Sequence, residues 1–227
     1  MLRRRLLCGQ LLLTCLLLQD WQFASSQNNP AKSINLASIE TSIEQGKLDQ
    51  VEKPLLDYAI AHPQEARALE LLGQVRYQQH RLEEAKALYQ RVVTLDPSSF
   101  KARINLGQLM YELGEHDPAR RLLEEIAATS SVNVNEGLAL AKALVLVGEF
   151  RKALAVADKL PSAVKSGSAL PLTAASYLGL GERQRLMALM PSIKKAAISN
   201  PEVAAECAEI LQKSRHVAGS SWPVAIS

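Results

Sequence analysis

Residues 66–99, ARALELLGQVRYQQHRLEEAKALYQRVVTLDPSS, decide the fold. Their apolar residues recur at helical spacing on either side of a short polar segment around His80. This pattern predicts two short amphipathic helices joined by a tight turn. Pro97 ends the second helix, because proline lacks the backbone N–H that a helix interior needs. Alternating β-branched runs are nearly absent from the rest of the chain, so we predict an all-α protein.

The same residue types return every 34 residues. The series are Pro63 and Pro97, Leu72 and Leu106, Gly73 and Gly107, Gly114 and Gly148, and Ala85, Ala119 and Ala153. A period of this length is typical of stacked helical units. A glycine inside a helix is unfavourable, so we expect Gly73 to let the paired helix approach closely. Gly114 and Gly148 fall where the first helix of a unit ends, a position that favours left-handed backbone.

This unit resembles the tetratricopeptide repeat family. The second copy carries the resemblance through Leu69, Leu72, Gly73, Ala85, Tyr89 and Pro97, whereas Arg76 and His80 depart from the pattern. The resemblance implies a right-handed α-solenoid of antiparallel helix pairs. We expect about five repeats, near residues 32–65, 66–99, 100–133, 134–166 and 167–200, with a capping helix over 202–217 and a tail over 218–227.

Three prolines lead to local predictions. Pro54 lies inside the second helix of the first repeat and is expected to kink it. Asp117 and Pro118 are expected to cap and open the second helix of the third repeat. Pro191 is expected to cut short the second helix of the fifth repeat.

The first 26 residues have the pattern of a secretory signal peptide. Arg3, Arg4 and Arg5 precede an apolar run over residues 6–18, and Ala24-Ser25-Ser26 places cleavage before Gln27. Residues 27–31 then form a polar leader. A retained membrane anchor is the weaker alternative, because a spanning helix needs about 20 apolar residues. Lipid attachment is weaker still, because Cys8 and Cys15 lack a small preceding residue. We therefore expect an exported protein, periplasmic or secreted, in a bacterial envelope setting.

Export would change the charge balance. The net charge of +3 falls to about +1 when the signal peptide leaves, so no broad nucleic-acid footprint remains. The only mature cysteine is Cys207, which excludes an internal disulfide. Membrane contact is expected only through an uncleaved signal segment.

Catalytic and metal-binding motifs are missing. The four histidines form no His-x3-His pair, no Cys-x2-Cys occurs, and neither a Gly-x-Ser-x-Gly elbow nor a phosphate-binding glycine loop is found. Cys207 lies on an apolar helical face and is interpreted as a buried, inert thiol. The sequence predicts no enzyme, no metal and no cofactor.

The family resemblance implies that the first helices of the repeats line a concave groove that binds protein or peptide. The candidate groove residues are Arg67, Glu70, Gln74, Tyr77, Lys101, Ile104, Gln108, Tyr111 and Lys142. Tyr77 and Tyr111 occupy equivalent positions, where they could form an aromatic ladder for a peptide or pack between adjacent helices. Relatives with a Lys/Asn/Arg clamp bind C-terminal carboxylates, but only Asn105 matches here. Asn135 and Ala139 occupy the last two clamp positions.

The sequence thus favours an exported, non-catalytic scaffold that binds a peptide or protein partner in the groove. The alternative is a docking or assembly subunit of an envelope enzyme complex. A hydrolase in its own right would need a catalytic group that the sequence does not show.

Overall fold

The computed structural model describes residues 34–128, 133–203 and 205–208, and no strand occurs within them. The helices are α2 (Leu36–Glu44), α3 (Leu48–Ala61), α4 (Ala66–Gln78), α5 (Leu82–Leu95), α6 (Phe100–Glu112), α7 (His116–Ala128), α8 (Val134–Leu146), α9 (Phe150–Asp158), α10 (Ser162–Lys165), α11 (Leu170–Gly179) and α12 (Arg183–Ser199). The predicted signal peptide over 1–26, the leader over 27–31, the tail over 218–227 and residues 209–217 of the predicted capping helix lie outside the described residues.

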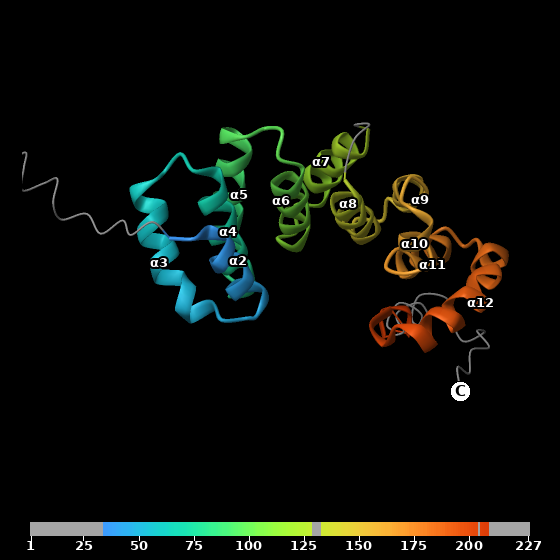
Figure 1. The fold of residues 1–227 in the computed structure, drawn as a ribbon. Coiled ribbons are helices and arrows are strands. Elements are labelled where there is room, and N and C mark those ends of the chain that lie inside the picture. Colours follow the sequence, from blue (N-terminus) through green and yellow to red (C-terminus); the bar gives the residue numbers. More distant parts are fainter. Residues whose placement is uncertain (1–33, 129–132, 204, 209–227) are drawn as a thin grey trace, which may run out of the picture. The chain divides into compact units, whose positions relative to one another are not determined.

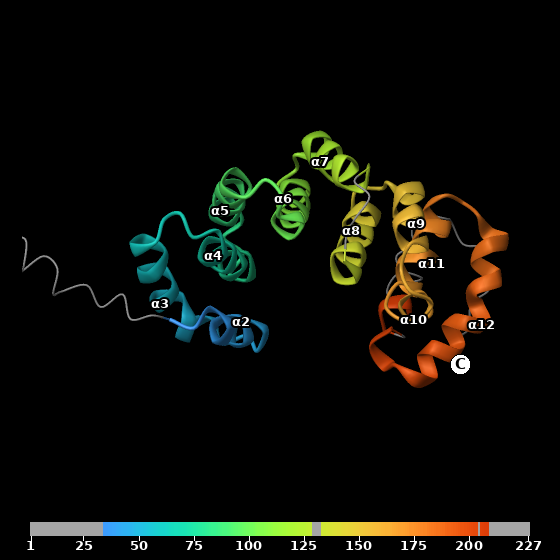
Figure 2. The ribbon, with the colours of Figure 1, turned by 45° about the horizontal axis from the view of Figure 1, so that its top comes forward.

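The helices repeat with the period of the sequence. The first helices α4, α6 and α8 begin at Ala66, Phe100 and Val134. Their partners α5, α7 and α9 begin at Leu82, His116 and Phe150, again 34 residues apart. Each helix from α5 to α8 packs on the next one along the chain, α9 packs on α11, and α11 packs on α12 (Figures 1 and 2). The chain is therefore an all-α solenoid of helix pairs, which confirms the predicted fold class.

Two compact units make up the chain, and their boundary falls between Leu72 and Gly73, inside α4. The described part of the first unit comprises α2, α3 and the beginning of α4. There, Ile43 on α2 and Leu55 on α3 are fully buried, and α2 packs on α3. α3 continues through Pro54, the position at which a kink was predicted.

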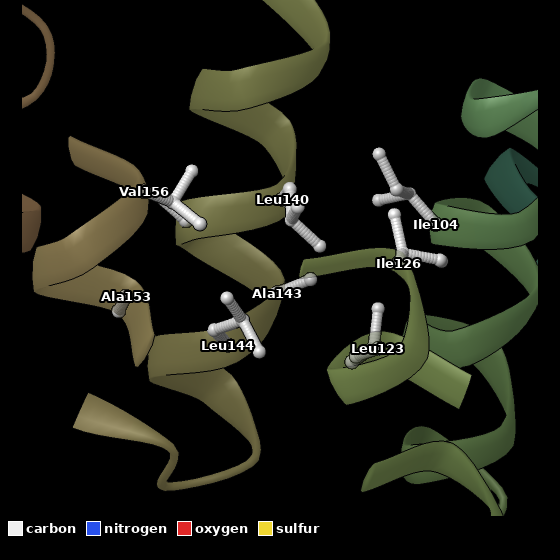
Figure 3. Packing of buried hydrophobic residues seen from close by; sticks show 9 residues of the cluster. Ile104, Leu123, Ile126, Leu140, Ala143, Leu144, Ala153 and Val156 are labelled. Carbon is white, nitrogen blue, oxygen red and sulfur yellow. The ribbon is translucent and has the colours of Figure 1, made fainter. Parts of the chain in front are cut away.

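The second unit holds a core cluster of buried residues that spans two repeats. Figure 3 shows Ile104 of α6 and Leu123 and Ile126 of α7 facing Leu140 and Leu144 of α8. All five side chains are nearly inaccessible to solvent. Because the same cluster takes side chains from both helices of the third repeat and from α8 of the fourth, burial of its apolar surface joins the two repeats.

Glycine positions agree with the sequence interpretation. A Cβ added at Gly73 would lie 3.2 Å from the Tyr89 ring of α5, and one at Gly107 would lie 2.8 Å from Leu123 of α7. These contacts confirm that glycine allows the paired helices to approach. The turns after α6 and α8 contain Gly114 at φ 83° and Gly148 at φ 82°, which confirms the predicted left-handed backbone.

The prediction for Pro191 was wrong, and the prediction for Asp117 and Pro118 was wrong in part. Pro191 lies inside α12, which continues to Ser199. Leu186 before this proline and Ile193 after it are buried in the same cluster, so burial on one face offsets the roughly 3 kcal/mol that an interior proline costs. α7 begins at His116, so Pro118 lies in its first turn, as predicted. Asp117 also lies in this turn, where it pairs with Arg120, and not at the N-cap.

The fourth and fifth repeats are joined by a feature that the sequence did not suggest. α9 ends at Asp158, and the single turn of α10 precedes α11.

Beyond α12, residues 201–203 and 205–208 are helical. Val203 and Cys207 are buried against α11 and α12, which agrees with the apolar helical face predicted for these residues.

Candidate functional site

The second unit has a small open pocket between α6 and α8, the first helices of consecutive repeats. Its volume is about 180 Å³. Lys101, Ile104 and Asn105 of α6 line one side, and Asn135, Glu136 and Ala139 of α8 line the other. Ile104 is only 1% exposed and belongs to the core below. Four of the six lining residues are polar, but the surface that they present to the pocket is mostly apolar.

The pocket's amide side chains are available to a ligand. Neither Asn105 nor Asn135 makes a side-chain hydrogen bond within the part of the chain that the structure describes, and the same holds for Gln108, one turn further along α6. Each amide offers both donors and an acceptor. Glu136 is already occupied, because its carboxylate accepts a bond from the Asn133 backbone N–H at 3.3 Å.

Local sequence fixes the position of α8 at this pocket. Asn133 caps the helix, and its side-chain oxygen accepts a bond from the Glu136 N–H at 2.9 Å. Together with the reverse bond from Glu136, this forms a capping box, which satisfies backbone donors at the helix start. Asn135 therefore projects from the first turn of a well-defined helix.

The two tyrosines predicted to line the groove have different surroundings. The Tyr77 side chain stays 39% exposed, and its hydroxyl donates to Glu112 Oε1 at 2.7 Å, which links α4 to α6. Partial burial, and then this bond, raise the pKa of Tyr77 to about 12. Tyr111 is half-buried, and its ring meets the His116 ring edge-on at 4.6 Å. Tyr77 is therefore held by a neighbouring repeat while one part of its ring remains open.

The candidate residues of α4 fall into two sets. Arg67 and Glu70 lie in the first unit, where Glu70 is buried and Arg67 pairs both with it, at 3.2 Å, and with Glu40 of α2. Burial of the Arg67 guanidinium acts to lower its pKa, but the bonds and charges of the two carboxylates outweigh this and raise the pKa. Gln74 and Tyr77 lie in the second unit, and Gln74 is half-buried.

Of the predicted groove residues, the structure brings Lys101 and Ile104 together at the pocket. Gln108 and Tyr111 lie further along α6, and Lys142 is exposed on α8. Our candidate set missed Asn105, Asn135, Glu136 and Ala139 as lining residues. The available signal was the pair of asparagines on the first helices of consecutive repeats. The repeat pattern places Asn135 among the groove positions of the fourth repeat, and Asn105 only among the clamp positions.

Groups that would support other chemistry are not found in the described residues. No cluster of three or more His, Cys, Asp or Glu side chains that could hold a metal occurs in them. The same residues contain no helix long and apolar enough to cross a membrane. Cys207 is 2% exposed, and burial raises the pKa of its thiol to about 11, which keeps it protonated and unreactive at neutral pH.

Comparison with known families identifies the repeated unit. Two family models, both described as tetratricopeptide repeat, match residues 44–100 and 76–131. Residues 44–131 are tetratricopeptide repeats. Tetratricopeptide repeats are in general non-catalytic scaffolds for protein–protein interaction. A search of curated protein sequences gives no match.

Solved tetratricopeptide repeat structures share the fold. YrrB, described as a TPR protein with an unusual peptide-binding site, has a TM-score of 0.53 at 13% identity over 83% of this chain and 96% of its own. A tetratricopeptide repeat protein from Parabacteroides merdae has a TM-score of 0.53 at 18% identity, covering 87% and 84%. The MamA protein has a TM-score of 0.50 at 19% identity, covering 82% and 94%. At these identities the similarity shows the fold alone.

Proposed function

We propose that the second unit is a non-catalytic scaffold that binds an extended peptide segment of a partner protein across α6 and α8. The observation that carries this proposal is the pocket between these helices, with Asn105 and Asn135 on its two walls and no side-chain partner for either amide in the described residues. An extended backbone presents alternating N–H and C=O groups. One asparagine amide can accept a hydrogen bond from the N–H and donate one to the C=O at the same time.

The rest of the pocket suits a peptide as well. Ile104 provides an apolar floor for one side chain, and the pocket is open at the surface, so the chain can continue beyond it on both sides. Lys101 and Glu136 bring opposite charges to the walls, which favours a ligand without a strong net charge at this point. The peptide-binding site named for YrrB supports a peptide as the ligand of this fold.

Affinity measurements test the proposal. A peptide is selected from a displayed library on the chain from residue 27 onward, and its Kd is measured by calorimetry. Asn105→Ala with Asn135→Ala removes two bidentate amides, and we expect at least about a tenfold weaker Kd, since each hydrogen bond contributes about 1 kcal/mol. Gln90→Ala, an exposed amide on α5, is the matched control. Unchanged affinity in the double variant, with an unchanged thermal melt, would refute the proposal.

We further propose that the protein is exported and acts in the periplasm or outside the cell. This rests on the three arginines, the apolar run and the small residues that precede Gln27. Expression of the full chain in a bacterial host tests it. We expect the product in the periplasmic fraction to have the mass of residues 27–227. A product of full-length mass in the membrane fraction would instead indicate a retained anchor.

A further inference from the structure

α12 has two sides of opposite character. One side packs on α11 and buries Leu186, Ile193 and Ala196 in a common cluster. On the outer side Met187 is 50% exposed and Ile198 is 89% exposed. In Figures 1 and 2 the side of α12 turned away from α11 meets no other labelled helix.

The exposed apolar residues form a strip. Met187, Pro191 and Ile198 are spaced i, i+4 and i+11, which places them on one helical face. Lys194 and Lys195 are exposed and lie on the two flanks of this face. We call these five residues the outer strip of α12.

The charged residues of the outer strip are Lys194 and Lys195, which make it basic. α12 contains four cationic residues and no acidic one. Lys194 and Lys195 make no ion pair within the described residues, whereas Arg185 is engaged by Glu182 at 2.8 Å and lies over the Tyr177 ring. Positive charge on the strip is thus left without a counter-charge from the described protein.

We propose that the outer strip of α12 docks on the surface of an anionic phospholipid bilayer, with the helix lying in the plane of the interface. Apolar side chains flanked by lysines are the pattern that such helices share, because the lysine stems contact acyl chains while their ammonium groups reach the headgroups. A bilayer also accepts protruding apolar side chains without a matching pocket. An acidic protein partner would need one.

This docking is independent of peptide binding at α6 and α8. It is peripheral, because α12 would lie in the plane of the interface with only its outer strip in contact with lipid. It also differs from the membrane contact expected from the sequence, which depended on an uncleaved signal segment.

Vesicle co-sedimentation of residues 27–227 tests the proposal. We expect binding to vesicles of equal parts phosphatidylcholine and phosphatidylglycerol, no binding to phosphatidylcholine alone, and loss of binding near 1 M salt, where the screening length falls to about 3 Å. Absence of binding to the anionic vesicles would overturn the proposal.

Two variants assign the binding to the outer strip. Lys194→Gln with Lys195→Gln should weaken partitioning by about tenfold or more, because each lysine near an anionic surface contributes substantially. Met187→Ser with Ile198→Ser should weaken it by about tenfold through loss of buried apolar area. Lys53→Gln with Ile60→Ser, on α3, is the matched control, since both residues are exposed and their heptad spacing places them on one helical face.

Other results would show that the outer strip binds something other than a bilayer, or that lipid binds elsewhere. Variants that lose no more binding than the control would show that lipid contacts lie elsewhere. Binding of polyglutamate with no binding of anionic vesicles would point to an acidic protein. Concentration-dependent self-association that the two variants abolish, again without vesicle binding, would point to a second copy of the chain. Each of these outcomes overturns the proposal.

Discussion

At the residue scale, one turn between paired helices has a backbone conformation that is unfavourable for the residue it contains. His80 has φ 59°, in the left-handed region, while Gly46, Gly114 and Gly148 occupy the equivalent turns at multiples of 34 residues. Side chains other than glycine lose about 1–2 kcal/mol there. Because His80 stands where the other repeats have glycine, the backbone of this turn is strained, and the surrounding structure holds it in this conformation.

We predict that His80→Gly raises the free energy of unfolding. The expected gain is about 0.5–1 kcal/mol, because relief of the left-handed strain is partly offset by the larger entropy of glycine in the unfolded chain. Urea denaturation followed by circular dichroism measures it. The reverse change Gly114→Ala should destabilise. A loss of stability in His80→Gly would show that the imidazole makes a contact worth more than the strain.

Tyr77 gives a second prediction at this scale, through pH. Its pKa is raised from 10.0 to about 12, so the folded state holds the proton more tightly than the unfolded state. The resulting stabilisation is complete below pH 10 and is lost as pH rises from 10.0 to about 12. It is smaller than the shift suggests, because Tyr77 is well exposed to solvent.

In Tyr77→Phe, the free energy of unfolding should therefore fall less between pH 10.0 and about 12 than it does in the wild type. Ultraviolet titration at the phenolate band should also lose one group that titrates at about pH 12. Tyr111→Phe is the control, since the Tyr111 ring contacts His116 and lies outside the bond to Glu112. An identical alkaline profile for the wild type and Tyr77→Phe would contradict the role of the bond to Glu112.

At the element scale, two asparagines at the start of α8 have different roles: Asn133 caps the helix, and Asn135 lines the pocket. Asn133 forms the capping box with Glu136, whereas Asn135 has no side-chain partner among the described residues. We predict that Asn133→Ala lowers the free energy of unfolding by about 1 kcal/mol, as loss of an N-cap does. Asn135→Ala should leave stability within about 0.5 kcal/mol and weaken peptide binding instead. Equal destabilisation by both changes, measured by thermal melts, would contradict this separation.

Helix boundaries show what a single sequence can predict. The starts of α4, α6 and α8 follow from the 34-residue period, and Gly114 marks the turn after α6. Local propensity could not predict that α12 continues through Pro191, because this depends on Leu186 and Ile193 being buried in one core after folding. Tertiary burial outweighed the local cost of the proline.

The candidate site was less predictable than the fold. Repeat positions indicate which helix a side chain belongs to, and Lys101 and Ile104 were found in this way at the pocket. They do not indicate which side chains are already paired. Glu70 was a candidate from its repeat position, but it is buried and bound to Arg67. Conversely, the repeat position of Asn135 indicates a groove residue, but only the structure shows that its amide has no side-chain partner among the described residues.

At the scale of the whole molecule, ion pairs repeat with the same period as the helices. Lys86 pairs with Glu115, and 34 residues later Arg120 lies 3.8 Å from Glu149. Lys152 extends the second pair, contacting Glu149 at 3.2 Å and Glu124 at 2.7 Å. These pairs connect the second helix of one repeat to the turn or second helix of the next, and so favour one register of stacking.

The network should contribute little stability but a clear salt dependence. We predict that Arg120→Gln with Lys152→Gln costs at most about 1 kcal/mol at low salt, and that this cost disappears near 1 M salt. The hydrogen bond with Lys152 is the main cause that lowers the pKa of Glu124 below 4.5, so the contribution is present above pH 4.5 and is lost as pH falls below it. Denaturation at several salt concentrations measures this. A cost that salt does not change would mean that packing of the side-chain stems, not charge, is involved.

The central claim is that a partner peptide lies across α6 and α8 and is held by Asn105 and Asn135. The most direct measurement is NMR of the side-chain amides during titration with a selected peptide, with the capping amide of Asn133 as the internal reference. We predict that the amide signals of Asn105 and Asn135 shift together and saturate at the Kd found by calorimetry, while the Asn133 amide stays in place. Unshifted Asn105 and Asn135 signals at saturation would contradict the account.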